Sequence, residues 1–201
     1  MTFISKKLIF IHVPKSAGTS IKTALAKQFK LEFHKGILHN EHQTFQQIKQ
    51  IQKGIELDRT SFAVVRNPYE RFVSIFRFIM RPFKLKKWFG SEGNLIFEKY
   101  NNFEKFTETF KMPLHFWHGN DHLSSQISWT EGVDRTFKIE NKVEIEKFLK
   151  TFGSNDLIGH ENKKEIYSGH NKMYRDFYNE TTKKIITKAY EADLDIFKYN
   201  F

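Results

Sequence analysis

A short loop that combines a lysine with several hydroxyl groups follows the first apolar run of the sequence. The run Lys7–Val13 is typical of a buried strand, and apolar residues recur at helical spacing from Thr19 to Phe29. A turn from a strand into a helix directs backbone N–H groups and the positive end of the helix dipole at one point, where they bind anions. Gly18 permits close approach to the backbone, and Lys15 adds a positive charge. The residues expected to hold a phosphate are Pro14, Lys15, Ser16, Ala17, Gly18, Thr19 and Ser20.

A second loop with a positive charge follows the next strong strand. Ser61–Val65 is a β-branched and apolar run that ends directly before Arg66. Asn67 and Pro68 then form a favourable helix start, with Asn67 as the cap and Pro68 at the first helical position. Ser74 follows Arg66 by eight residues, about two turns into this helix. We therefore expect the guanidinium of Arg66 and the hydroxyl of Ser74 to bind one phosphate from two sides.

The two loops differ from those of nucleotide triphosphatases. In the Walker pattern G-x-x-x-x-G-K-[ST] the lysine follows the last glycine, whereas Lys15 precedes Gly18 by three residues. The acidic residue expected at the end of a later strand is replaced by Arg66. Magnesium-dependent triphosphate chemistry is therefore disfavoured, although a nucleotide kinase or hydrolase of this broad fold stays an alternative. An ordinary Ser/Gly turn that caps a helix is the plainest alternative for the first loop.

The elements around these loops alternate between strand and helix signals. Strands are predicted at Lys7–Val13, Leu31–His34, Ser61–Val65 and Thr136–Glu140. Helices are predicted at Thr19–Phe29, Thr44–Lys53, from Pro68 through Ile79, in pieces around Leu95–Phe110, and at Lys142–Phe152 and Thr181–Ala192. This alternation predicts an α/β fold in which helices cover a parallel sheet. No repeat or Pro/Gly/Ser-rich linker divides the sequence, so we expect a single domain over residues 1–201.

The composition restricts the class of protein and of partner. Hydrophobic residues make up 39% and charged residues 28%, as in a globular protein, and 22 phenylalanines predict an aromatic core. There is no cysteine, and no apolar run approaches the ~20 residues of a membrane span. The net charge of +10 favours polyanionic partners such as nucleotides, acidic glycans, nucleic acid or an anionic membrane surface, without choosing among them.

Both loops resemble motifs of one enzyme family. The segment F-I-H-V-P-K-S-A-G-T-S resembles the 5′-phosphosulfate loop of sulfotransferases that use 3′-phosphoadenosine-5′-phosphosulfate (PAPS), especially of the branch that acts on carbohydrates. R-N-P-Y-E-R-F-V-S at residues 66–74 is similar to the family's 3′-phosphate motif, R-[DN]-P-x-x-R-x-x-S. Arg71 matches this motif too, but a role on the helix surface or in an ion pair is an equal alternative. Residues 122–126, 137–141 and 190–199 resemble further family segments more loosely.

The resemblance implies a fold and a set of site residues. The fold would be a P-loop-like three-layer α/β fold with a central parallel sheet flanked by helices. PAPS would be the co-substrate, with residues 14–20 around its 5′-phosphosulfate and with Arg66 and Ser74 on its 3′-phosphate. Lys15 would stabilise the leaving 5′-phosphate. No His/Asp/Glu spacing indicates zinc, and the implied chemistry needs no metal.

Histidine is the usual base near neutral pH, and this chain has nine. His42 begins a segment that resembles the family's H-x-T-x-x-x-I, whose histidine lies on the acceptor side, so we predict His42 as the base. His39 is the runner-up and is expected near the acceptor. His122 and Gln126 are predicted to line the acceptor pocket, with helix packing as the alternative. His12, in the first strand, is expected to be a buried histidine and not a base.

The sequence thus predicts a sulfotransferase that moves a sulfuryl group from PAPS to an acceptor hydroxyl, with a carbohydrate as the acceptor by resemblance. The partners would be the nucleotide donor and a glycan. A non-enzymatic polyanion-binding protein is a further alternative, although no nucleic-acid-binding module is recognised. Many relatives act behind a membrane anchor, which this sequence does not show. We therefore expect the cytoplasm, with a peripheral place at a membrane as the alternative. The oligomeric state is not indicated.

Overall fold

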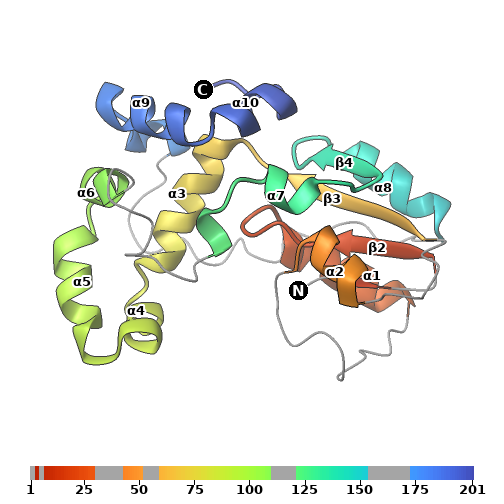
Figure 1. The fold of residues 1–201 in the computed structure, drawn as a ribbon, viewed down its shortest axis with the longest axis horizontal. Helices are drawn as coiled ribbons and strands as arrows, with labels where there is room; N and C mark the ends of the chain where they lie inside the picture. The colour runs from red at the N-terminus through yellow and green to blue at the C-terminus, as the bar shows by residue number, and fades with distance from the viewer. Residues whose placement is uncertain (1–2, 5–6, 30–42, 52–58, 110–120, 154–172) are drawn as a thin grey trace. The chain divides into compact units, whose positions relative to one another are not determined.

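The computed structural model describes residues 3–4, 7–29, 43–51, 59–109, 121–153 and 173–201 (Figure 1). Its contacts concentrate in two compact units, Met1–Arg66 with Ser125–Gly169 and Asn67–Ser124 with His170–Phe201. The expected single domain over residues 1–201 stays a prediction, and each unit is described in turn.

The first unit is built on a sheet of four strands. They are β1 (Phe3–Ile4), β2 (Leu8–Ile11), β3 (Thr60–Val65) and β4 (Arg135–Lys138), in the spatial order β1-β2-β3-β4 (Figure 1). β1 pairs antiparallel with β2, whereas β2, β3 and β4 are parallel to one another, so that Leu8 lies opposite Thr60 and Val65 opposite Lys138. β2 and most of β3 are buried runs of apolar residues, as parallel strands covered on both faces must be.

Helices cover both faces of this sheet because successive side chains of a strand point to opposite sides. Leu8 and Phe10 of β2 pack with helices α1 (Gly18–Phe29) and α8 (Lys142–Thr151). Ile9 and Ile11 pack with α2 (Phe45–Ile51) and α7 (Ile127–Thr130). The predicted α/β fold with a central parallel sheet flanked by helices is therefore confirmed. The strand predicted at residues 31–34 lies outside the described residues.

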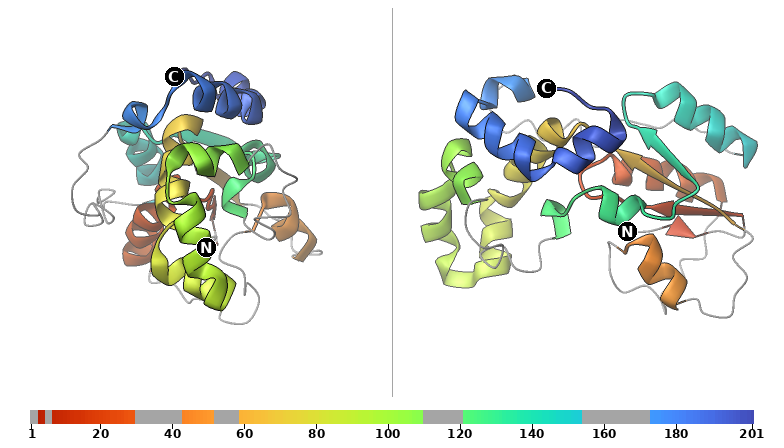
Figure 2. Two further views of the ribbon diagram at one scale, coloured as in Figure 1. Left: turned by 90° about the vertical axis from the view of Figure 1, so that its left-hand side faces the viewer. Right: turned by 45° about the horizontal axis from the view of Figure 1, so that its top comes forward.

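The second unit is helical in its described part (Figures 1 and 2). Its α-helices are α3 (Pro68–Ile79), α4 (Pro82–Phe89), α5 (Gly93–Tyr100), α6 (Phe103–Glu108), α9 (Glu180–Ala189) and α10 (Glu191–Phe197). Short 3-10 turns lie at Gly90–Glu92 (η1), Asp121–Leu123 (η4) and Tyr174–Phe177 (η5). α3 begins as predicted, since the side chain of Asn67 accepts a hydrogen bond from the N–H of Tyr69 at 3.0 Å and Pro68 takes the first helical position.

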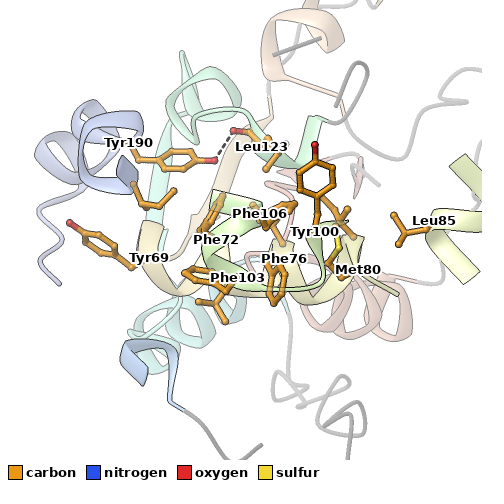
Figure 3. Close-up of a cluster of buried hydrophobic side chains, with 14 residues drawn as sticks. Tyr69, Phe72, Phe76, Met80, Leu85, Tyr100, Phe103, Phe106, Leu123 and Tyr190 are labelled. Atoms are coloured by element: carbon orange, nitrogen blue, oxygen red, sulfur yellow. Dashed lines mark hydrogen bonds between the residues drawn. The ribbon is translucent and has the colours of Figure 1, made fainter. Parts of the chain in front are cut away.

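Aromatic side chains form the core of the second unit, as the phenylalanine count predicted. Phe72 and Phe76 of α3 both pack against Phe103 and Phe106 of α6, with ring centroids 5.3–5.6 Å apart (Figure 3). The hydroxyl of Tyr190 donates a hydrogen bond of 2.8 Å to the carbonyl oxygen of Leu123 in the same cluster. Rings at these separations add to the stabilisation that their buried area provides.

The C-terminal helix is the clearest difference from the sequence prediction. One helix was predicted over Thr181–Ala192, but the chain forms α9 and α10 with a break at Tyr190, whose φ is −120° and ψ is 27°. Tyr190 and Asp193 are both buried. The break lets both side chains enter the interior, an outcome of tertiary packing that overrides local helix propensity.

Candidate functional site

The loop after β2 holds an unusual backbone conformation. The N–H of Ser16 donates to the carbonyl oxygen of Val13 at 3.3 Å, which closes a turn with Pro14 and Lys15 in the middle. Lys15 has a φ of 67°, and Ala17 has a φ of 58°. Proline followed by a residue of positive φ is the arrangement of a type II turn, which normally places glycine where Lys15 stands. A non-glycine residue in this region costs about 1–2 kcal/mol, and such strain gathers at ligand sites.

α1 begins immediately after this turn. Its first backbone hydrogen bond runs from the N–H of Ile21 to the carbonyl oxygen of Ala17, at 3.2 Å. The N–H groups of a first helical turn have no acceptor within the helix, and they carry the positive end of the helix dipole. Ser16 and Ser20 are buried, Thr19 is exposed, and Lys15 is half-buried. The predicted strand-turn-helix geometry of an anion-binding loop is therefore present.

Glycine is needed at position 18 because a neighbouring side chain leaves no space for a Cβ atom, and not because of the backbone φ. A Cβ atom added at Gly18 would overlap the imidazole ring of His12, at Cδ2 and Nε2. The His12 ring in turn stacks near the ring of Phe10, with an interplanar angle of 17° and 6.2 Å between centroids. His12 is half-buried just beyond β2, where it fills the space beside the start of α1. The sequence predicted a buried histidine inside the first strand, but β2 ends at Ile11 and the His12 side chain is only half-buried, because it lies beside the start of α1.

Replacing Gly18 with alanine is expected to destabilise the protein through this overlap. Overpacking of this kind costs roughly 1–3 kcal/mol, or roughly 2–12 °C in unfolding midpoint for a chain of this size. Removal of the ring in His12→Ala opens the space, so the double variant should lose less stability than the sum of the two single variants. Thermal unfolding of the four proteins measures this coupling. Strict additivity would show that the ring is not the reason for glycine.

Arg66 joins the second loop to the first. It follows β3 directly, and its Nη1 donates to the carbonyl oxygen of Lys15 at 3.4 Å. The backbone N–H and the carbonyl oxygen of Arg66 both bind the side chain of Gln126. The Arg66 N–H donates to Oε1 of Gln126 at 2.9 Å, and Nε2 of Gln126 donates to the Arg66 carbonyl oxygen at 2.8 Å. Ser16 Oγ donates to the same Oε1 at 3.2 Å. Two loops that lie about fifty residues apart in the chain thus meet at one buried amide.

A model described as the sulfotransferase family matches residues 1–200. The chain belongs to the sulfotransferase family. No curated protein and no solved structure matched it. A member of this family is a transferase that moves a sulfuryl group. Membership therefore argues against the kinase and the polyanion-binding alternatives.

The structure brings some of the predicted sulfotransferase residues together and leaves others apart. Lys15, Ser16, Arg66 and Gln126 lie in the first unit and are connected by the hydrogen bonds above. Ser74 lies in α3 of the second unit, half-buried, and its predicted contact with a phosphate rests on the motif alone. The predicted bases His42 and His39 lie outside the described residues.

The two residues predicted for the acceptor pocket of this sulfotransferase have well-defined contacts. His122 lies in η4 of the second unit, where its ring stacks on Phe78 with 4.9 Å between centroids. Gln126 is completely buried; its Oε1 accepts hydrogen bonds from Arg66 and Ser16, and its Nε2 donates one to Arg66. Sequence reasoning missed this connection because the partners lie 60 and 110 positions away, and no local pattern marks such a contact. Covariation among relatives is the signal that would find it.

Within the described ranges, no group of three or more His, Asp or Glu side chains could hold a metal ion. None of the helices placed by the structure is both long enough and apolar enough to cross a membrane.

Proposed function

We propose that this sulfotransferase takes its sulfuryl group from PAPS and transfers it to a hydroxyl group of a carbohydrate. The observation that carries the proposal is the contact between Arg66 and the backbone of Lys15, since it joins a strained phosphate-type loop to a second cationic loop. A donor with a 5′-phosphosulfate and a 3′-phosphate presents two separate anionic groups. Two adjoining loops, each with its own cation, fit a ligand of that kind.

Each loop has its own part in donor binding. The backbone N–H groups at the start of α1, with Thr19 and Ser20, would bind the oxygens of the 5′-phosphosulfate. The Arg66 guanidinium is a planar fork of N–H donors, and a fork of this kind suits a phosphate. On the motif, Arg66 and Ser74 would bind the 3′-phosphate. These contacts would distinguish PAPS from ATP and from 5′-AMP.

PAPS supplies an activated sulfuryl group: the acceptor oxygen bonds to sulfur while the bond from sulfur to the bridging oxygen of the 5′-phosphate breaks. Lys15 would stabilise the negative charge that develops on that bridging oxygen, and charge stabilisation of this type is often the largest contribution to catalysis. The proton of the acceptor hydroxyl would pass to His42, with His39 as the alternative base. The enzyme would release 3′,5′-ADP (PAP) and the sulfated acceptor.

The carbohydrate acceptor is proposed on the form of the first loop and on charge. With a net charge of +10, the surface would attract an acidic glycan in preference to a neutral one, in a salt-dependent way. Transfer assays with neutral and acidic oligosaccharides at low and high salt separate these acceptors.

Thermal unfolding with PAP, 5′-AMP and magnesium-ATP tests the donor site. At a hundred times its dissociation constant a ligand stabilises the native state by ~2.7 kcal/mol, or roughly 5–11 °C for a chain of this size. PAP is expected to produce this shift and 5′-AMP only a fraction of it, because 5′-AMP lacks the 3′-phosphate. Stabilisation by magnesium-ATP without any effect of PAP would contradict the proposal and favour a kinase.

A further inference from the structure

We propose that Gln126 is a positioning residue that holds the phosphate loop and Arg66 in the one geometry that binds the donor. The proposal rests on the proposed function, since it concerns the same donor site. It gives Gln126 a task on the donor side, in place of the acceptor contact that the sequence predicted.

The amide of Gln126 binds the backbone of Arg66 as a peptide group of a neighbouring strand would. β3 pairs with β4 as far as Val65, whose carbonyl oxygen accepts a hydrogen bond from the N–H of Ile139 at 2.9 Å. At the next residue the side-chain amide of Gln126 both accepts from the N–H of Arg66 and donates to its carbonyl oxygen, at 2.9 and 2.8 Å. A primary amide can make both bonds because it carries a donor and an acceptor side by side, as a peptide group does. Arg66 is thereby fixed one residue beyond the end of the ladder.

The same amide also fixes the phosphate loop. Oε1 of Gln126 accepts a second hydrogen bond, from the hydroxyl of Ser16 at 3.2 Å. The N–H of Ser16 is directed at Val13, so both donors of this serine serve the shape of the turn. We therefore assign the Ser16 hydroxyl to loop geometry and leave the phosphate to the other loop donors. Gln126 is 0% exposed and Ser16 is 1% exposed, so water has no ready access to replace these bonds.

The connection places two cationic residues at a set separation. Lys15 lies next to Ser16 in the turn, and the Arg66 side chain donates to the carbonyl oxygen of Lys15. A shift of either loop would change the distance between the two charges that bind the donor. Positioned groups lose much of their effect when displaced by about 1 Å. Loss of Gln126 is therefore expected to weaken donor binding beyond what the loss of stability explains.

Two variants of Gln126 separate positioning from stability. Gln126→Leu has a similar size and removes the three hydrogen bonds to Ser16 and Arg66. Gln126→Glu keeps the length of the side chain and Oε1, but its ionised form directs a carboxylate oxygen at the carbonyl oxygen of Arg66, with no proton between them. Once protonated, the carboxyl group again has a donor and an acceptor side by side. Burial favours this protonated form, whereas the nearby charges of Lys15 and Arg66 oppose it.

Ser61→Ala is the matched control. Ser61 lies in β3, at the end of the strand away from Arg66, and is 0% exposed. It exchanges hydrogen bonds of 2.6–3.0 Å with Asp134. These bonds hold the pKa of Asp134 below its ordinary value. The control variant should lower the unfolding temperature without moving either loop.

The experiment measures the dissociation constant of PAP by calorimetry, from about pH 5.5 to about pH 8.5. We expect Gln126→Leu to bind PAP at least about tenfold more weakly at every pH. We expect the weakening in Gln126→Glu, relative to the wild type, to grow as the pH rises. Ser61→Ala should bind PAP as the wild type does. If the wild type binds PAP and both Gln126 variants match it, the positioning role is overturned while the proposed function stands. If the wild type does not bind PAP, the proposed function fails and the positioning role with it.

Discussion

Lys15→Ala is expected to reduce sulfuryl transfer by about 10²–10³-fold while the protein stays folded. Removal of one group that stabilises developing negative charge has an effect of this size in other enzymes. Lys15 lies in the turn between β2 and α1, half-buried, and its backbone oxygen accepts the hydrogen bond from Arg66. Alanine retains that backbone oxygen, so the loss should fall on kcat more than on the midpoint of thermal unfolding.

Lys15→Gly makes this test sharper because the φ of Lys15 is 67°. Glycine adopts this φ without the penalty of about 1–2 kcal/mol that a side chain brings, although it also makes the unfolded chain more flexible. The glycine variant should therefore be at least about as stable as the wild type and yet lose transfer to the same extent as Lys15→Ala. Lys15→Arg keeps the charge on a longer side chain and should retain part of the activity. Full transfer by Lys15→Ala would show that this lysine does not serve catalysis.

Much of the fold follows from local signals in the sequence. The apolar runs of β2 and β3, the Asn67–Pro68 start of α3 and the periodicity of α8 each predict their element to within a residue or two. The prediction is correct for these elements because the strands are buried on both faces and the helices carry one apolar stripe, so the sequence pattern matches the environment of each element. The order of two motifs, each placed after a strand, predicted the family that the match over residues 1–200 shows.

The connections between distant residues were not predictable in the same way. Gln126 binds Ser16 and Arg66, His12 fills the space beside Gly18, and Tyr190 breaks the C-terminal helix. Each depends on which side chains meet after the sheet and helices have packed, and spacing along the chain does not encode that. Strain at Lys15 was likewise invisible, because a lysine is not the residue that a positive φ favours.

Arg71 shows how a matching motif position can serve the fold. Its side chain is 1% exposed, so the predicted helix-surface role is wrong. Nη2 of Arg71 donates to the carbonyl oxygen of His122 at 2.8 Å, and its guanidinium lies 6.0 Å from the ring centre of Tyr190. Burial lowers the pKa of Arg71, while Tyr190 and the buried Asp193 act to raise it. Arg71 thus connects α3 with η4 and α10 inside the second unit.

Arg71→Met is therefore expected to be the most destabilising single change described here. It removes a buried positive charge that interacts favourably with Tyr190 and the buried Asp193, and leaving a buried charge uncompensated costs about 3–5 kcal/mol. For a chain of this size the midpoint of thermal unfolding should fall by roughly 6–20 °C. Arg77→Met is the matched control on the same helix. Arg77 is exposed and lies 4.8 Å from the ring centre of Phe177, a contact worth about 0.5–1 kcal/mol.

Adding Asp193→Asn to Arg71→Met should recover part of the lost stability, because the second change neutralises the buried carboxylate that the first one isolates. A structural role also predicts that Arg71→Met, kept well below its unfolding temperature, still binds PAP. A variant with an unchanged midpoint and no affinity for PAP would instead assign Arg71 to the donor site. Since the motif R-[DN]-P-x-x-R-x-x-S contains a second arginine besides Arg66, these measurements show whether Arg71 binds phosphate or holds the helices together.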